Sequence, residues 1–498
     1  MKKQLFFLAA ATALFAACSS SDDSLNSSQV AQPQGTGEIA VNFNSYVNRT
    51  TTRAGQTGEQ NLNAIKTDKV GFGVFGYYTN ADNYDQSFIP DFMYNQQVKW
   101  HQTEDYWTYS PIKYWPNEFG SGAFSDDVDK VSFFAYAPFV SVNASSGKVK
   151  DNQASTYDKD NGDVTMGIVG MKRNNDTGDP MIKYISTFYT DEQVDLTWGT
   201  MDATSYASGW SKKNGGTPQT VTAGMPWLNM EHPYATSSTW GVAQKIAFDF
   251  KHALASLNVT VDVFADVVTP DGASTPANPA TGTKVYVRSV TFEGFDTKGA
   301  LNLNNTVASK ALWYNFDFLN ELNNGAETTI KDGRKDGKEG LTAATKEYAA
   351  INPTLVQSTT WGGSGEPAGV TVAPTNLFAQ YNGGGEIQPE GDEKAPIFVI
   401  PNGDPLKVTI EYDVLTADRK LPDKLNDGVT PGSVVKNVIT RYITSNEVGS
   451  TSPSAFILEN GKKYTIKLHL GLNSVQFDAS ITSWDNGGDG GADLPHNN

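Results

Sequence analysis

The residue types that could do chemistry are present, but their spacing matches no complete catalytic or cofactor site. Residues 71–76, GFGVFG, fit the G-x-G-x-x-G pattern of dinucleotide sites. Such a site needs a strand followed by a helix, whose N-terminal amides hold the pyrophosphate. Here the pattern lies in an aromatic run that continues through Tyr77 and Tyr78. We therefore predict a strand with closely packed glycines and no bound nucleotide.

The histidines and acidic residues do not predict a metal site either. No two histidines have zinc-site spacing, and one cysteine cannot complete such a site; they are His101, His232, His252, His469 and His496. Asp158, Asp160 and Asp163 lack the length, closing glutamate and flanking helices of an EF-hand. No G-x-S-x-G nucleophile elbow occurs. We predict no catalytic residues, no metal, no cofactor and no enzymatic activity.

Aromatic residues gather in one short stretch, and two interpretations of them stay open. They are Trp100, Tyr106, Trp107, Tyr109, Tyr114 and Trp115. Flat aromatic faces can stack on sugar rings, which would indicate carbohydrate binding. More often such residues form part of a sandwich core or lie half-buried beside it.

The N-terminus predicts export and lipidation. Lys2 and Lys3 precede the apolar run of residues 5–17, which is too short to span a bilayer as a helix. The run ends in small residues before Cys18 and resembles the lipobox of bacterial lipoproteins. We expect residues 1–17 to be a signal peptide, Cys18 to carry the acyl chains, and residues 18–36 to be a flexible tether. Two or more acyl chains hold a protein stably on a membrane.

Composition limits the remaining possibilities. A chain of 498 residues is too long for one ordinary core, so at least two domains are expected. A net charge of −17 argues against nucleic acid as a partner, because phosphate binding needs basic residues.

The residue pattern predicts an all-β fold. Short alternating runs separated by Gly, Asn, Asp, Ser and Pro are typical of antiparallel sandwiches. They include residues 38–47, 130–137, 257–263, 408–414 and 475–481. Asn460-Gly461 between two such runs predicts a hairpin. A short helix is expected only over Ala311–Asn320.

Domain boundaries follow from composition. Residues 205–239 are rich in Ser, Gly, Thr and Pro, which places the boundary near residue 240. We expect an N-terminal sandwich over residues 37–240 and a C-terminal one over 241–498. Polar, glycine-rich stretches around 321–395 predict surface insertions in the second domain.

Several segments together resemble the fimbrillin-like lipoproteins, the subunits of type V pili. In chain order they are GFGVFGYY (71–78), PDFMYNQQVKW (90–100), WTYSPIKYWPNE (107–118), KVSFFAYAP (130–138), VDLTWG (194–199), KIAFDFKHALASLNVTV (245–261) and ENGKKYTIKLHLGL (459–472). The resemblance implies two transthyretin-like β-sandwich domains in tandem. It also implies assembly by donor-strand exchange, in which an arginine-specific protease removes the first strand and a neighbouring subunit's strand replaces it.

The resemblance assigns roles to residues of this chain. The displaced first strand would be residues 38–47, with Ile39, Val41, Phe43 and Val47 on one face. Cleavage would follow Arg53, leaving Ala54 as the new N-terminus; Arg49 and Thr50 are the second choice. A C-terminal donor strand would contain Val475, Phe477, Ala479 and Ile481, although that run more often belongs to its own domain.

The predicted function is a structural subunit of a surface fimbria that supports adhesion. A tip or minor role is as plausible as a shaft role, and an anchor would keep its first strand. The partners would be other pilus subunits, the protease and the outer membrane, where the lipoprotein is surface-exposed before it joins the fimbria; a host or bacterial surface ligand stays open. The alternative is a surface glycan-binding lipoprotein of a nutrient-uptake system.

Overall fold

The computed structural model describes most of the strand-forming part of the chain. The described residues are 39–47, 66, 69–80, 82–103, 106–116, 129–140, 166–169, 176–186, 194–212, 215–233, 244–263, 283–296, 298–307, 310–314, 354–355, 375–376, 397–417, 420–423, 431–443, 455–470 and 475–483. All regular elements within these ranges are strands, which confirms the predicted all-β class. No helix in these ranges is long and apolar enough to cross a membrane.

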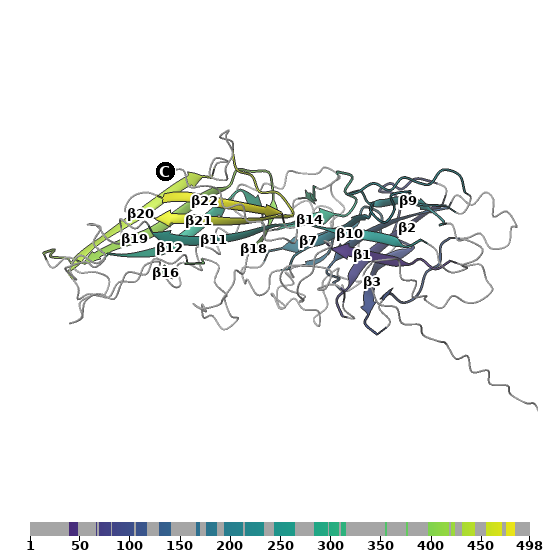
Figure 1. Cartoon of the computed structure of the whole chain (residues 1–498), viewed down its shortest axis with the longest axis horizontal. Coiled ribbons are helices and arrows are strands. Elements are labelled where there is room, and N and C mark those ends of the chain that lie inside the picture. The colour runs from purple at the N-terminus through teal and green to yellow at the C-terminus, as the bar shows by residue number, and fades with distance from the viewer. Residues whose placement is uncertain are drawn as a thin grey trace, which may run out of the picture.

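The largest sheet lies in the first half of the chain and has the order β1-β10-β8-β5-β2-β3-β4, with β9 also on β5. Its strands are β1 (Phe43–Val47), β2 (Phe72–Asn80), β3 (Met93–His101), β4 (Tyr106–Thr108), β5 (Lys130–Ala137), β8 (Thr197–Met201), β9 (Trp227–Glu231) and β10 (Ile246–His252). Figure 1 shows β1 and β10 side by side in this sheet, on the right.

The central strands of this sheet are buried on both faces, which explains their continuous apolar sequences. One face contributes Phe72, Val74 and Phe133 to a cluster that we call core A. The opposite face contributes Phe75 and Tyr136 to a second cluster, core B. Core B also receives side chains from residues 301–303 and 398–400, so it lies between the two halves of the chain.

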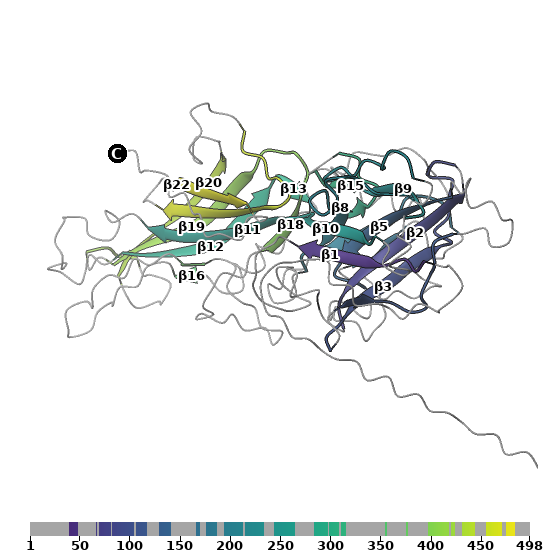
Figure 2. The same ribbon diagram turned by 45° about the vertical axis from the view of Figure 1, so that its right-hand side comes forward.

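A small sheet joins segments from both halves. Its order is β15-β14-β7-β6, and its strands are β6 (Met166–Val169), β7 (Met181–Ile185), β14 (Lys298–Asn302) and β15 (Leu312–Tyr314). Figure 1 shows β7 and β14, and Figure 2 shows β15, between the larger sheets.

Two further sheets form the second half, on the left of Figure 1. The first has the order β13-β18-β11-β21-β22, with β17 on β11, and its strands are β11 (Ala255–Val263), β13 (Phe295–Asp296), β17 (Thr375–Asn376), β18 (Ile397–Pro401), β21 (Lys462–Leu470) and β22 (Val475–Ser483). The second has the order β16-β12-β19-β20, and its strands are β12 (Thr283–Glu293), β16 (Thr354–Leu355), β19 (Lys407–Ala417) and β20 (Gly432–Tyr442).

The strand pairing shows that two local predictions, a helix over Ala311–Asn320 and a hairpin at Asn460-Gly461, are wrong. Leu312–Tyr314, inside the expected helix, is strand β15, because pairing with β14 and packing of Trp313 against core B outweigh a weak helical pattern. Asn460-Gly461 does not close a hairpin between its flanking runs. Phe456 bonds instead to Leu406 and Ile443, and β21 pairs with β11 and β22.

The stretch that resembled a linker packs against core A over its described part. Trp210 and Trp227 are fully buried there. β10 follows this stretch and pairs with β1 and β8 of the first sheet. The boundary near residue 240 stays a prediction.

Candidate functional site

The first strand completes core A. Ile39, Val41 and Phe43 are all buried in it, at most 6% exposed. They alternate along an extended chain, so all three side chains point to one face. The burial of these three predicted strand residues is therefore as expected from the sequence, and their proposed role is considered below.

Main-chain bonds hold this segment on two sides. Phe43–Val47 pairs in parallel with β10, and the Ile246 N–H donates to the Asn42 carbonyl at 2.8 Å. On the other side, the Val41 N–H donates to the Lys113 carbonyl at 2.9 Å, and the Trp115 N–H donates to the Ile39 carbonyl at 2.8 Å. Residues 113–115 follow β4, the far end of the sheet order. The segment 39–47 therefore links the two ends of the first sheet.

Phe43 packs against four aromatic rings of core A. Its ring centroid lies 5.4 Å from that of Tyr109, 5.8 Å from Phe133, 6.1 Å from Phe248 and 6.4 Å from Phe72. Most of these contacts are edge-to-face, the geometry that aromatic rings prefer. Without residues 39–47, these rings would line an apolar groove between β10 and residues 113–115.

Tyr109 adds a side-chain bond to this strand. Its hydroxyl donates to the Val41 carbonyl at 2.7 Å. Burial raises the pKa of Tyr109 above its usual value, because the phenolate would lose its hydration. Tyr109 therefore stays neutral and able to donate at physiological pH. The aromatic stretch that left two interpretations open contributes Trp107, Tyr109 and Trp115 to core A.

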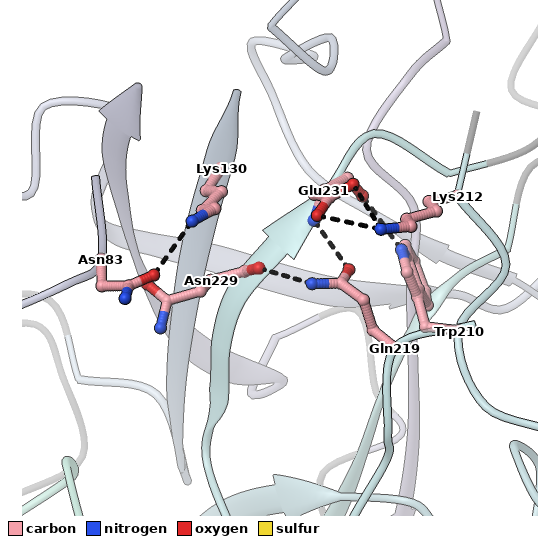
Figure 3. A network of polar contacts seen from close by, with 7 residues as sticks. All are labelled: Asn83, Lys130, Trp210, Lys212, Gln219, Asn229 and Glu231. Carbon is pink, nitrogen blue, oxygen red and sulfur yellow. Dashed lines mark hydrogen bonds and ion pairs between the residues drawn. The ribbon is translucent and has the colours of Figure 1, made fainter. Parts of the chain in front are cut away.

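A polar network connects Trp210, Lys212 and Gln219 to the residues of β9 (Figure 3). Gln219 bridges two residues of β9, because its amide donates to the Asn229 carbonyl at 2.9 Å and accepts from the Glu231 N–H at 3.0 Å. Trp210 Nε1–H donates to the Glu231 carbonyl at 2.9 Å, and Lys212 pairs with the Glu231 carboxylate at 3.3 Å. Trp210 in turn packs against the ring of Trp115, with centroids 5.7 Å apart.

Several predicted site residues lie outside the described ranges. These are Cys18, Arg49, Thr50, Arg53 and Ala54. The backbone of Val47 is described as the last residue of β1, opposite Phe250. Its side chain lies outside the described part of the structure. The lipidation and cleavage assignments stay predictions.

The candidate donor strand is paired within its own sheet. Val475, Phe477, Ala479 and Ile481 belong to β22, which runs antiparallel to β21 over nine residue pairs. Ile481 is 40% exposed. The donor-strand assignment and the domain to which this run belongs stay predictions.

The glycine motif lies at the start of β2, as predicted: Gly71 immediately precedes the strand, and Gly73 and Gly76 are in it. Gly71 has a φ of +64°, and a Cβ there would lie 2.0 Å from the Val98 carbonyl oxygen. A Cβ at Gly73 would lie 2.3 Å from the Tyr136 ring. These glycines allow close packing of chain segments, and within the described residues the motif leads into strand β2 and not into a helix.

His252, for which no catalytic role was predicted, lies beside a buried carboxylate. Its Nδ1 lies 2.7 Å from a carboxylate oxygen of Asp195, and both side chains are buried. Among the described residues, no group of three or more histidine, cysteine or acidic side chains could hold a metal ion.

No family model matches the chain, and no curated protein matches it either. Several solved structures match it. A fimbrial protein from Bacteroides vulgatus is 16% identical, with 89% of this chain and 99% of that chain covered and a TM-score of 0.45. The fimbrial anchor protein of Porphyromonas gingivalis is 8% identical over 89% of this chain and 96% of its own, with a TM-score of 0.24.

The tip fimbrial protein of Porphyromonas gingivalis, solved with a C-terminal truncation, is 9% identical over 90% of this chain and 99% of its own, with a TM-score of 0.21. The chain is thus similar, at low sequence identity, to fimbrial proteins, the group that its sequence segments resemble.

Proposed function

We propose that this chain is a structural subunit of a surface fimbria, assembled by proteolysis-triggered donor-strand exchange and without catalytic activity. The observation that supports this most is the position of residues 39–47. They fill core A and link both ends of the first sheet through main-chain bonds. A segment of this kind can be exchanged for another extended strand that supplies the same bonds and similar side chains.

The free energy of burying the first strand supports strand exchange that starts only after cleavage. Burial of Ile39, Val41 and Phe43 stabilises the uncut chain by about 1.5–3 kcal/mol each before costs. While the strand is covalently attached, its effective concentration at the groove is very high. Cleavage after Arg53 makes it a separable peptide, and a partner strand can then compete for the open edges, which otherwise favour aggregation.

Cleavage would also separate the fibre from its lipid, because Cys18 lies on the discarded side of Arg53. Because β22 is paired with β21, it is not free to be donated to a neighbour, which supports a subunit that accepts a strand. A tip or minor role therefore stays as open as a shaft role. The alternative glycan-binding lipoprotein loses its original support, since the aromatic stretch that suggested it lies largely in core A.

The test is digestion of the chain from residue 19 with an arginine-specific protease, followed by mass spectrometry and size-exclusion chromatography. We expect a new N-terminus at Ala54, with Thr50 as second choice, and slow formation of oligomers. A synthetic peptide of residues 38–47 in excess should suppress the oligomers, because it refills the groove.

The matched control replaces Arg49 and Arg53 with alanine and should stay monomeric under the same digestion. If the cut wild-type protein keeps its first strand and stays monomeric at high concentration, strand exchange is excluded for this chain.

A further inference from the structure

One side chain of the first strand is poorly suited to the core that it enters. Ser45 is 2% exposed, and its hydroxyl oxygen has no hydrogen-bond partner. It follows Phe43 by two positions, so both side chains point to the same face of the strand. The residue paired with Ser45 in β10 is Phe248, a member of core A. The first strand therefore places a hydroxyl group without a partner in an apolar environment.

Other buried hydroxyl groups of this sheet are bonded. Ser132 of β5 accepts from the Asn229 N–H at 2.8 Å, and Thr197 and Thr200 of β8 donate to main-chain carbonyls at 3.1 and 2.9 Å. Among the described residues, Ser45 is the only serine or threonine whose hydroxyl is fully buried without a partner. Such a group weakens the binding of its strand, because it has lost its bonds to water and gained none in return.

The main-chain bonds of the groove place few demands on the sequence of a strand. The groove bonds to Ile39, Val41 and Asn42 through main-chain atoms of these residues. Any extended strand with an N–H in the place of Val41 can form the same bonds, which excludes only proline there. Selectivity for one strand over another must therefore come from the side chains that enter core A.

Two positions of the strand set that selectivity. Phe43 lies among four aromatic rings, so its place requires a large apolar side chain. The place of Ser45 requires a side chain no larger than that of serine and without a polar atom that would lack a partner. Alanine meets both requirements.

We propose that the groove selects an incoming strand that has an aromatic residue in the place of Phe43 and a small apolar residue, such as alanine, in the place of Ser45. This inference rests on the proposed strand exchange and names the chemistry of the partner strand. While the first strand is covalently attached, its high effective concentration compensates for the unpaired hydroxyl. Cleavage removes that advantage, and a partner strand with alanine then binds more tightly than the strand it replaces.

The chain contains a second run with this pattern. Residues 475–481, VQFDASI, match residues 41–47, VNFNSYV, without a gap and in the same chain direction. Valine, phenylalanine and an aliphatic residue occupy the first, third and seventh places of both runs, and Ala479 stands in the place of Ser45. Because β22 is paired with β21, this run serves here as a probe sequence for the groove.

The first test needs no cleavage. In urea denaturation of the uncut chain from residue 19, Ser45→Ala should raise the equilibrium constant of folding about tenfold, which corresponds to about 1.4 kcal/mol. Asn42→Ala is the matched control, because Asn42 is half-buried on the opposite face and its amide donates to the Ala40 carbonyl at a long 3.4 Å. The control should change this constant by less than about twofold.

The second test measures displacement of the first strand from the cut chain. A chain from residue 19 lacks Cys18, the only cysteine, so its Ser20→Cys variant carries a single dye on the tether. After digestion with the arginine-specific protease, release of the labelled fragment lowers the fluorescence anisotropy of the dye. The peptide of residues 38–47 with Ser45→Ala should displace the fragment at about one tenth of the concentration that the wild-type peptide requires.

Two further peptides establish where the competitor binds. Phe43→Ala in the peptide should abolish displacement, whereas Asn42→Ala should displace as the wild-type peptide does. The peptide of residues 472–481 repeats the comparison in a second sequence, and its Ala479→Ser variant should require about ten times more peptide. If neither form of this second peptide displaces the fragment, the peptides of residues 38–47 decide the question.

The inference is overturned if Ser45→Ala leaves the uncut chain no more stable than the wild type, or if the serine and alanine peptides displace the fragment equally well. Failure of every peptide, together with a stabilised Ser45→Ala chain, would have a different meaning. It would contradict the proposed strand exchange and still confirm that the groove prefers alanine to serine at this position.

Discussion

The hydroxyl of Tyr109 donates a hydrogen bond of 2.7 Å to the main-chain carbonyl of Val41. The two residues are 68 positions apart in sequence. Tyr109 comes just after β4, the last strand in the order of the first sheet, whereas Val41 comes just before β1, its first strand. A single side chain thus ties the first strand to the opposite end of the sheet. We expect loss of this hydrogen bond to weaken the binding of the first strand to the sheet while the rest of core A stays packed.

Alkaline pH should destabilise the uncut protein through this tyrosine and its buried relatives. Burial is the main reason why the pKa of Tyr109 in the folded chain is raised above the usual tyrosine value of about 10. Its contribution is therefore fully present below about pH 10 and is lost as pH rises toward the folded pKa. Thermal unfolding between pH 7 and pH 11.5 should show a plateau followed by a decline.

Tyr109→Phe should lower stability by about 1 kcal/mol at pH 7 and make the alkaline decline shallower. A decline of equal steepness in this variant would assign the effect to other tyrosines, such as Tyr136, whose pKa is also raised by burial.

Phe43→Ala should destabilise the uncut chain by about 3–5 kcal/mol, because a cavity replaces a ring enclosed by four others. Urea denaturation monitored by tryptophan fluorescence measures the change. Asn44→Ala in the same strand is the matched control, since Asn44 is half-buried, and it should cost less than about 1 kcal/mol. Similar losses for both variants would contradict the assignment of Phe43 to the core.

Gly71→Ala should be far more damaging than Gly215→Ala. Both glycines have positive φ, at +64° and +72°, so both substitutions add backbone strain of about 1 kcal/mol. Only at Gly71 would the new methyl group meet a carbonyl oxygen, at 2.0 Å, while nothing lies within 4 Å of it at Gly215. Chemical denaturation of the two variants separates steric clash from strain.

The same motif should bind no dinucleotide, since Gly71 and Gly73 serve packing. Calorimetry with NAD and ATP is expected to show no heat of binding in the wild type. Micromolar binding that Gly73→Ala abolishes would reverse this interpretation.

Cys18→Ala should abolish acylation, because Cys18 is the only cysteine in the chain. Metabolic labelling with a palmitate analogue in the native host, followed by membrane fractionation, measures the outcome. Cys18→Ser tests the thiol requirement with the smallest change in size. Label that persists in either variant would contradict the lipobox assignment.

Strand positions were predictable wherever apolar residues alternate with polar ones. Residues 257–263 and 475–481 lie in β11 and β22 for this reason. β20 was not predictable, because its apolar residues come in adjacent pairs, Val434-Val435 and Val438-Ile439, which fit no period of two. Eleven pairings with β19 determine its conformation instead.

The candidate site was predictable only in part. The burial of Ile39, Val41 and Phe43 follows from their alternation. Their partners do not, since β10 lies about two hundred residues away and pairs in parallel, whereas the sequence favours antiparallel sheets. The aromatic run around Tyr109 was visible in the sequence, but nothing local indicates that its hydroxyl reaches Val41.

The short link between β10 and β11 has a mechanical consequence. Ala253 and Leu254 join these strands and are fully buried. The Ala253 N–H bonds to Leu196 beside β8, and the Leu254 carbonyl accepts from Gly461 at the start of β21. The link is thus hydrogen-bonded to both halves, which restricts rotation of one half against the other. Pulling the two halves apart would have to break these hydrogen bonds, so the link should resist tension better than a solvated linker of the same length.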